Sequence, residues 1–197
     1  MEDTMSIITT IPFESLQAHN VVDKDKKCRY SMVRTWNIQK DKVTIIMFNP
    51  RTLEPNPFIL GQSLSKCVSI VIENGDYGAI EVVNLFARTS NSQKELEMEY
   101  KVFDEVNFKY IKGAVESSSM VVLAWGKKGA KVSRNKKFKN LLINYRGKLK
   151  CFDIYDNKQP KYPRNLSLGT TLKRLLHGYE RGYIFFVILF MEKVVTI

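Results

Sequence analysis

The sequence is poor in the residues that build disulfide frameworks and zinc sites. Its 197 residues include three cysteines, Cys28, Cys67 and Cys151, and two histidines, His19 and His177. These residues lie far apart, and none of their spacings is that of a zinc motif. We therefore expect neither a disulfide framework nor a bound metal.

Signals for export, for membrane insertion and for nucleotide loops are also missing. Residues 1–13 begin with two acids in the first three positions and lack the apolar core of a signal peptide, so the expected compartment is the cytoplasm. The most apolar run, residues 183–191, is well short of the roughly 20 residues that span a bilayer, and we interpret it as a strand rather than as a membrane contact. G-x-G-x-x-G and Walker A loops are absent, so no cofactor is expected.

Positive charge is in excess. The chain has 31 Lys and Arg against 20 Asp and Glu, a formal net charge of +11, which favours a polyanionic partner such as double- or single-stranded DNA. Hydrophobic residues make up 44% and charged residues 26%, as in globular proteins with a packed core. The length suits one domain that needs no partner to fold, so we expect a monomer.

Apolar runs alternate with helical patterns between residues 29 and 176. Strands are predicted over residues 29–36, 43–48, 80–86, 120–125 and 148–155. Helices are predicted over residues 59–73, 104–117, 133–145 with Ser133 as the N-cap, and 170–176. This alternation predicts an α/β domain, a three-layer sandwich around a mainly parallel four-stranded sheet. Residues 1–28 are interpreted as an irregular lead-in and residues 177–197 as an apolar appendage.

The carboxyl ends of parallel strands are where ligands bind in such sheets, and polar residues follow the predicted strands there. Asn49-Pro50, Asn84, Trp125-Gly126 and the loop 156–165 are expected at one edge. Taken alone, Asn49-Pro50 is explained by turn chemistry. Asn84 is different, because an amide inside an apolar strand needs hydrogen-bond partners, and its adjacent donor and acceptor suit the edge of a nucleobase.

Basic and aromatic residues gather around the same predicted edge. Residues 127–139 contain seven Lys or Arg, which favours phosphate contact over a merely solvated helix face. The residues expected to contact DNA are Arg51, Arg88, Lys127, Lys128, Arg134, Lys136, Lys161 and Arg164. Those that could stack on a base, although each could also be core, are Phe58, Phe86, Trp125 and Tyr162. The nearby carboxylates Glu54, Asp153 and Asp156 are interpreted as surface charges.

Five segments in order along the chain carry a family resemblance. They are RYSMVRTW (29–36), IIMFNPRT (45–52), EVVNLFART (81–89), VVLAWGKKG (121–129) and CFDIYDNKQPKYP (151–163). Together they resemble domain-of-unknown-function family 1643 over about residues 29–168. More widely, an Asn-Pro turn, an asparagine ending the next strand, a glycine after an apolar strand and a proline-bearing last loop resemble the uracil-DNA glycosylase superfamily.

The wider resemblance implies a uracil-DNA glycosylase-like fold and a DNA glycosylase that hydrolyses the N-glycosidic bond of uracil or of a modified base, such as those of phage DNA, without metal or cofactor. It implies that Asn49 positions the attacking water, that Asn84 reads the base and that Tyr162-Pro163-Arg164 contacts DNA. Tyr162, which stands where the superfamily usually has the histidine that contacts the leaving base, is the second residue expected to be catalytic. The alternatives are a nucleic-acid-binding protein that kept the fold without catalysis and an enzyme acting on free nucleosides or nucleotides.

Overall fold

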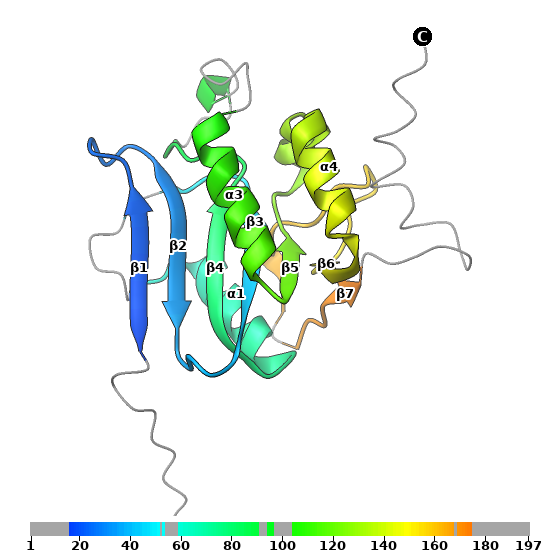
Figure 1. The fold of residues 1–197 in the computed structure, drawn as a ribbon. Helices are drawn as coiled ribbons and strands as arrows, with labels where there is room; N and C mark the ends of the chain where they lie inside the picture. The colour runs from blue at the N-terminus through cyan, green and yellow to red at the C-terminus, as the bar shows by residue number, and fades with distance from the viewer. Residues whose placement is uncertain are drawn as a thin grey trace, which may run out of the picture.

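A computed structural model describes residues 16–51, 53, 59–90, 94–96, 104–167 and 169–174, and its ribbon is drawn in Figure 1. The expectations for residues 1–15, Glu54, Phe58 and the apolar segment 177–197 lie outside these described residues. Within the described part of the chain, no helix has the length and apolar character needed to cross a membrane.

One sheet of seven strands, in the order β1-β2-β4-β3-β5-β6-β7, organises the molecule. The strands are β1 (Gln17–Val22), β2 (Arg29–Thr35), β3 (Asp41–Met47), β4 (Tyr77–Asn84), β5 (Met120–Leu123), β6 (Leu149–Cys151) and β7 (Lys173–Arg174). β4, β3, β5 and β6 are mutually parallel, whereas β1, β2 and β7 join antiparallel. The α/β class is confirmed, but the sheet is mixed and wider than the mainly parallel four-stranded sheet that was expected.

The extra strands lie where the apolar pattern is weakest. β1 falls in the segment interpreted as irregular. It is an edge strand, and five of its six residues are exposed. Because neither face of β1 is buried, its sequence shows no alternation of apolar and polar residues. β7 replaces part of the helix predicted over residues 170–176 and pairs with β6. β6 itself covers only three residues of the predicted strand 148–155.

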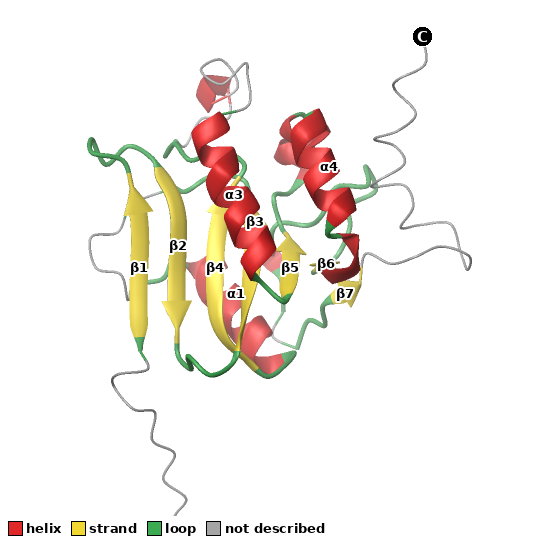
Figure 2. Cartoon of the chain, in the orientation of Figure 1, coloured by secondary structure: helices red, strands yellow, loops and turns green. Residues whose placement is uncertain are grey.

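Helices cover both faces of the sheet (Figure 2). α1 (Gln62–Glu73) packs on one face, where Ile45 and Val82 contribute to a fully buried cluster. α3 (Glu105–Ser117) and α4 (Lys136–Asn144) cover the other face, where Ile46 and Val83 are buried. Adjacent residues of one strand are thus buried on opposite faces, and this explains why the central strands are continuously apolar.

Polar side chains cap the amino ends of both α3 and α4. Asp104 caps α3, where its carboxylate accepts hydrogen bonds from the backbone N–H groups of Val106 and Asn107. α4 is capped by Asn135, whose Oδ1 accepts from the backbone nitrogen of Lys137 at 2.9 Å, so the prediction of Ser133 was wrong. Ser133 instead lies in a 3-10 turn, η3 (Val132–Arg134), which follows η2 (Lys127–Ala130). Further 3-10 turns are η4 (Arg146–Lys148) and η5 (Pro163–Asn165).

The strand order creates a switch point at the carboxyl end of β3. From β3 the chain passes through α1 to β4 on one side, and from β4 it returns through α3 to β5 on the other side. The loop after β3 leads to α1 on one face of the sheet, and the loop after the neighbouring β5 leads to α4 on the other face. This divergence opens a crevice between the carboxyl ends of the two strands, which is where open α/β sheets bind ligands. Phe48 and Asn49 come directly after β3 at this point.

Two glycines offer a test of this packing. A Cβ at Gly78, in β4, would lie 1.8 Å from the carbonyl oxygen of Asn37, whereas a Cβ at Gly113, exposed in α3, would meet nothing within 4 Å. We expect Gly78→Ala to lower the free energy of unfolding by about 1–3 kcal/mol through overpacking. Gly113→Ala should raise it by about 0.5–1 kcal/mol, because alanine loses less backbone entropy in a helix. Urea unfolding measures both, and equal midpoints for Gly78→Ala and wild type would contradict the close approach.

Candidate functional site

Two cavities open at the carboxyl edge of the parallel strands, on either side of Asn49 and Tyr162. The first, which we call the arginine cavity, has a volume of about 330 Å³ and is lined by Arg29, Arg34, Arg51 and Arg164 together with Asn49, Asn84 and Tyr162. The second, the aromatic cavity, has a volume of about 440 Å³ and is lined by Phe48, Trp125, Tyr155 and Tyr162 with Lys127 and Lys128. Both volumes fall within the roughly 300–1,000 Å³ of small-molecule sites.

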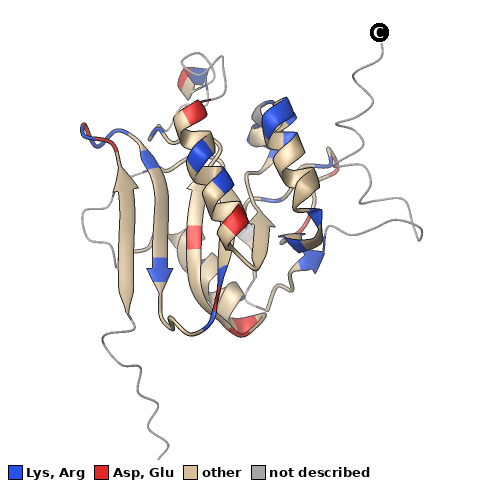
Figure 3. Cartoon of the chain, viewed as in Figure 1, with Lys and Arg blue, Asp and Glu red and all other residues tan. Residues whose placement is uncertain are grey.

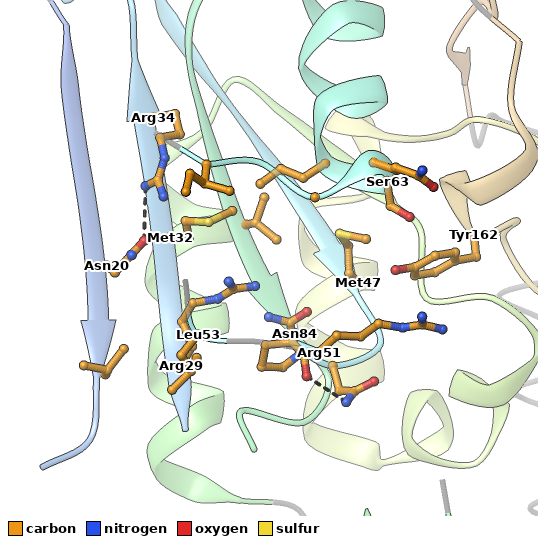
Figure 4. A pocket seen from close by; sticks show the side chains of 18 of the residues that line it. Asn20, Arg29, Met32, Arg34, Met47, Arg51, Leu53, Ser63, Asn84 and Tyr162 are labelled. Carbon is orange, nitrogen blue, oxygen red and sulfur yellow. Dashed lines mark hydrogen bonds between the residues drawn. The ribbon is translucent and has the colours of Figure 1, made fainter. Parts of the chain in front are cut away.

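Asn84 lies in the wall of the arginine cavity as the last residue of β4 (Figure 4). Its side chain is on the α1 face of the sheet and is 1% exposed. Its backbone carbonyl accepts a hydrogen bond from Nδ2 of Asn107 in α3, at 2.9 Å. Its own Nδ2 is buried and has no hydrogen-bond partner among the described residues. A buried amide donor without an acceptor is costly, so this nitrogen is a ready point of attachment for a ligand acceptor.

Asn49 lies between the two cavities, and its amide orientation is set by the backbone around it. Nδ2 donates to the carbonyl oxygens of Ser90, at 2.7 Å, and of Pro50, at 2.9 Å. These two bonds assign the nitrogen and leave Oδ1 as the acceptor that the side chain can offer to a water or a ligand. Asn49 and Asn84 therefore present opposite hydrogen-bonding character, an acceptor and a donor, to one cavity.

Arg29 and Arg34, both in β2, supply positive charge that the sequence reasoning missed. Nη1 of Arg34 donates to Asn20 Oδ1 at 3.1 Å and to the carbonyl oxygen of His19, which ties β2 to β1, and also to the carbonyl oxygen of Val33 within β2. Burial, and secondarily the neighbouring Arg34 charge, lower the pKa of Arg29 to about 10. The Nε atoms of both arginines are buried without a partner among the described residues, and none of the described residues that line the cavity is acidic.

A bulge in β2 explains why Arg29 and Arg34 line the same cavity although they are five residues apart. Val21 and Val22, consecutive in β1, pair with Ser31 and Arg29, so Tyr30 is an extra residue in β2. Tyr30 stacks on Tyr110 of α3, with ring centroids 4.9 Å apart, and thus points to the opposite face of the sheet. The extra residue reverses the alternation and directs Arg29 to the α1 face, which a strict two-residue period would not predict.

The aromatic cavity combines ring faces with ammonium groups. Trp125 is 2% exposed, and its Nε1 donates to Gln159 Oε1 at 3.0 Å, so its ring is fixed in the cavity wall. Lys127 Nζ lies 4.9 Å from the centre of the Tyr155 ring, a cation–π contact. Gly126 has a φ of 76°, and a Cβ there would lie 3.1 Å from Cβ of Tyr162, so a glycine permits both the turn after β5 and the close approach of the last loop.

Several of the other predicted site residues do not line either cavity. Phe86, which was expected to stack on a base, is buried in the core on the α3 face, edge-on to Phe48 with ring centroids 5.3 Å apart, and lines neither cavity. Arg88, Arg134 and Lys136 also lie outside the walls of both cavities. Arg134 and Lys136 are exposed around the start of α4, where Figure 3 shows Lys and Arg residues at the same edge as the strand ends. Phe58 is outside the described residues.

Asp153 has a structural role in the loop after β6, which carries Tyr162. Its carboxylate bridges Lys161 and Lys173, with each Nζ 2.6 Å from one oxygen, and its carbonyl accepts from the backbone nitrogen of Lys161. These two ammonium groups hold the pKa of Asp153 well below its usual range, and the carboxylate in turn raises the pKa of Lys161. Lys161 is therefore engaged in ordering the loop that carries Tyr162, in addition to the DNA contact predicted for it.

Comparison with known families shows which family the chain matches. The family described as "Protein of unknown function (DUF1643)" matches residues 29–164, which spans β2 to η5 and so includes both asparagines, Tyr162 and the four arginines. No curated protein matches the chain.

The pairing of Asp153 predicts a pH dependence. Because its pKa is lowered in the folded state, its ion pairs stabilise the fold fully above about pH 4, the pKa region of an unfolded aspartate, and this contribution disappears as the pH falls toward the folded pKa. Asp153→Asn should lower the free energy of unfolding by about 1 kcal/mol or less at pH 7, since the pair is partly exposed. The difference from wild type should shrink below pH 4 in urea titrations, and a difference that grows on acidification would contradict the assignment.

Proposed function

The chain belongs to the DUF1643 family, and from its site we propose that it is a DNA glycosylase that hydrolyses the N-glycosidic bond of uracil or of a modified base in DNA. The observation that carries the proposal is that Asn84, at the end of β4, and Asn49 and Tyr162, in the loops after β3 and β6, line a single cavity. That cavity adjoins a second one lined by aromatic rings and lysines. An enzyme that acts on a base in DNA needs a pocket for the extruded base and cations that hold the backbone.

The chemistry requires little beyond positioned polar groups. The oxygen of a water bonds to C1′ of the sugar, the N-glycosidic bond breaks with its electron pair going to the base, and the base takes up a proton as the water loses one. Asn49 Oδ1 would accept a hydrogen bond from the water and orient it, while the proton passes to solvent, because an amide does not take it. Asn84 Nδ2 would donate to the base as negative charge develops on it.

A second candidate is a nucleic-acid-binding protein that retains the site without catalysis. Tyr162, at the position where a histidine is usual in the superfamily that the chain resembles, favours it. A tyrosine hydroxyl can donate a hydrogen bond to a leaving base, but it lacks the charged form that histidine offers near neutral pH. The two candidates differ in one measurable respect, which is the release of free base and the appearance of abasic sites.

Substitution of the two asparagines tests the proposal. Purified protein is incubated with DNA that carries uracil or defined modified bases, and abasic sites are scored in single-turnover reactions. Asn49→Ala and Asn84→Ala should each slow base release by about 100–1,000-fold, as expected when one positioned polar group is removed. Asn140→Ala, at an exposed position in α4, is the matched control and should leave the rate unchanged.

Either of two results would count against the glycosylase. One is the absence of base release from every such DNA by folded wild-type protein. The other is a rate that both asparagine substitutions leave intact. DNA binding that persists without release would support the second candidate.

The basic edge predicts a salt-dependent affinity for DNA. Arg51 and Arg164 are exposed and line both cavities, and Lys127 and Lys128 line one. Arg51→Ala should weaken duplex binding and reduce the slope of log K against log salt by about 0.9, the value for one phosphate that is no longer neutralised. Arg146→Ala removes the same charge from η4, which precedes the amino end of β6 at the opposite edge, and should change neither the affinity nor the slope. Equal effects of the two substitutions would show that the strand-end edge does not face DNA.

A further inference from the structure

The arginine cavity has more positive charge and more unpaired donors than a neutral base would use. Four guanidinium groups line it, and none of its described lining residues is acidic. Arg34 is 8% exposed and Asn84 is 1% exposed, and neither Nε of Arg34 nor Nδ2 of Asn84 has a hydrogen-bond partner among the residues that the structure describes. Charges and donors buried in this way are normally balanced by a counter-charge or an acceptor.

The first turn of α1 adds a further positive feature to the same cavity. Its N-cap is Gly61, which has no side chain to cap the helix, and its first turn has no acidic residue. Gly61, Gln62 and Ser63 all line the arginine cavity, and Figure 4 shows Ser63 facing Met47 and Tyr162 across it. The N–H groups at the start of a helix that lack capping side chains attract anions, and this helix is 12 residues long.

We propose that the arginine cavity binds an oxyanion carried by a nucleobase or a nucleoside, so that the natural substrate presents a carboxylate or phosphate to Arg29, Arg34 and the start of α1. This inference rests on the proposed function, which it deepens by naming the charge of the substrate. Figure 4 shows the guanidinium of Arg29 directed toward the amide of Asn84. One ligand could therefore place an acceptor at Asn84 and an anionic oxygen at Arg29.

A purely structural role for the two β2 arginines, with no ligand, would explain Arg34 but not Arg29. Arg34 does bind the backbone of His19 and the side chain of Asn20, and these two contacts stabilise the β1–β2 pair, while its bond to the Val33 carbonyl lies within β2. In Arg29, by contrast, the buried Nε has no hydrogen-bond partner among the described residues, and burial lowers the pKa of the guanidinium. The bulge at Tyr30 places this guanidinium inside the cavity, where an anionic ligand would restore the electrostatic balance.

The experiment compares pairs of ligands that differ in charge. Binding of the full chain to uracil-5-carboxylate and to uracil-5-carboxamide is measured by calorimetry at low and high salt. A second pair, uridine 5′-monophosphate and uridine, and inorganic phosphate alone distinguish a carboxylate on the base from a phosphate as the source of the oxyanion. We expect the charged member of at least one pair to bind tenfold or more tightly than its neutral partner, with the advantage reduced by salt.

Two variants assign that preference to the cavity. Arg29→Gln should remove most of the charge preference. Ser63→Asp places a carboxylate at the start of α1, so it should raise Tm through the helix dipole while abolishing anion binding, which separates a failure to bind from a failure to fold. Arg146→Ala is the matched control and should bind as wild type does.

The outcomes are distinct from those that test glycosylase activity. Equal binding of the charged and neutral members of both pairs, or a charge preference that both variants retain, overturns the inference. If the protein prefers the charged ligand but releases no base from any DNA, the inference that the cavity binds an oxyanion stands and the proposed reaction is excluded. A chain that releases uracil from DNA and shows no charge preference keeps the reaction and excludes the inference.

Discussion

Two hydrogen bonds from the buried side chain of Asn107 hold the end of β4 in place, and the site depends on the position of that strand end. Asn107, in α3, is 1% exposed, and its Nδ2 donates to the carbonyl oxygens of Asn84 and Leu85 at 2.9 and 3.1 Å. These bonds hold the end of β4 from the α3 face, in a low-dielectric core where such bonds are strong. The Asn84 side chain, on the other face, thereby lines the arginine cavity while its Nδ2 has no partner among the described residues. A rigid backbone with an unpaired amide donor is a suitable arrangement for recognising a ligand.

The mixed sheet matters because the antiparallel strands bring charge to a site that the parallel strands define. β4 and the turn directly after β3 supply the two asparagines, whereas β2 supplies Arg29 and Arg34 from a strand that runs in the opposite direction. β1 then supplies two hydrogen-bond acceptors to Nη1 of Arg34, the side-chain oxygen of Asn20 and the carbonyl oxygen of His19. The segment before the parallel core is thus part of the same sheet and helps to orient a site residue.

Tyr162 connects the two cavities. It lines both, and its Cβ approaches Gly126, so its position depends on the turn after β5 as well as on its own loop. Asp153 orders that loop through Lys161, and Gln159 of the same loop holds Trp125. In the proposed glycosylase, a base in one cavity and a flanking part of the nucleic acid in the other would therefore both contact Tyr162. This residue would connect base recognition with backbone binding.

The sequence by itself determined the four parallel strands, the helices between them and the gathering of Asn49, Asn84, Trp125 and Tyr162 at one edge. Those features follow from local apolar periodicity and from the rule that parallel strands end together. Only the tertiary structure decided that Phe86 is core, that Asn135 caps α4 and that Arg29 enters the cavity. Arg29 depends on one extra residue in the pairing of β1 with β2, and pairing register is a property of two distant segments that neither segment shows alone.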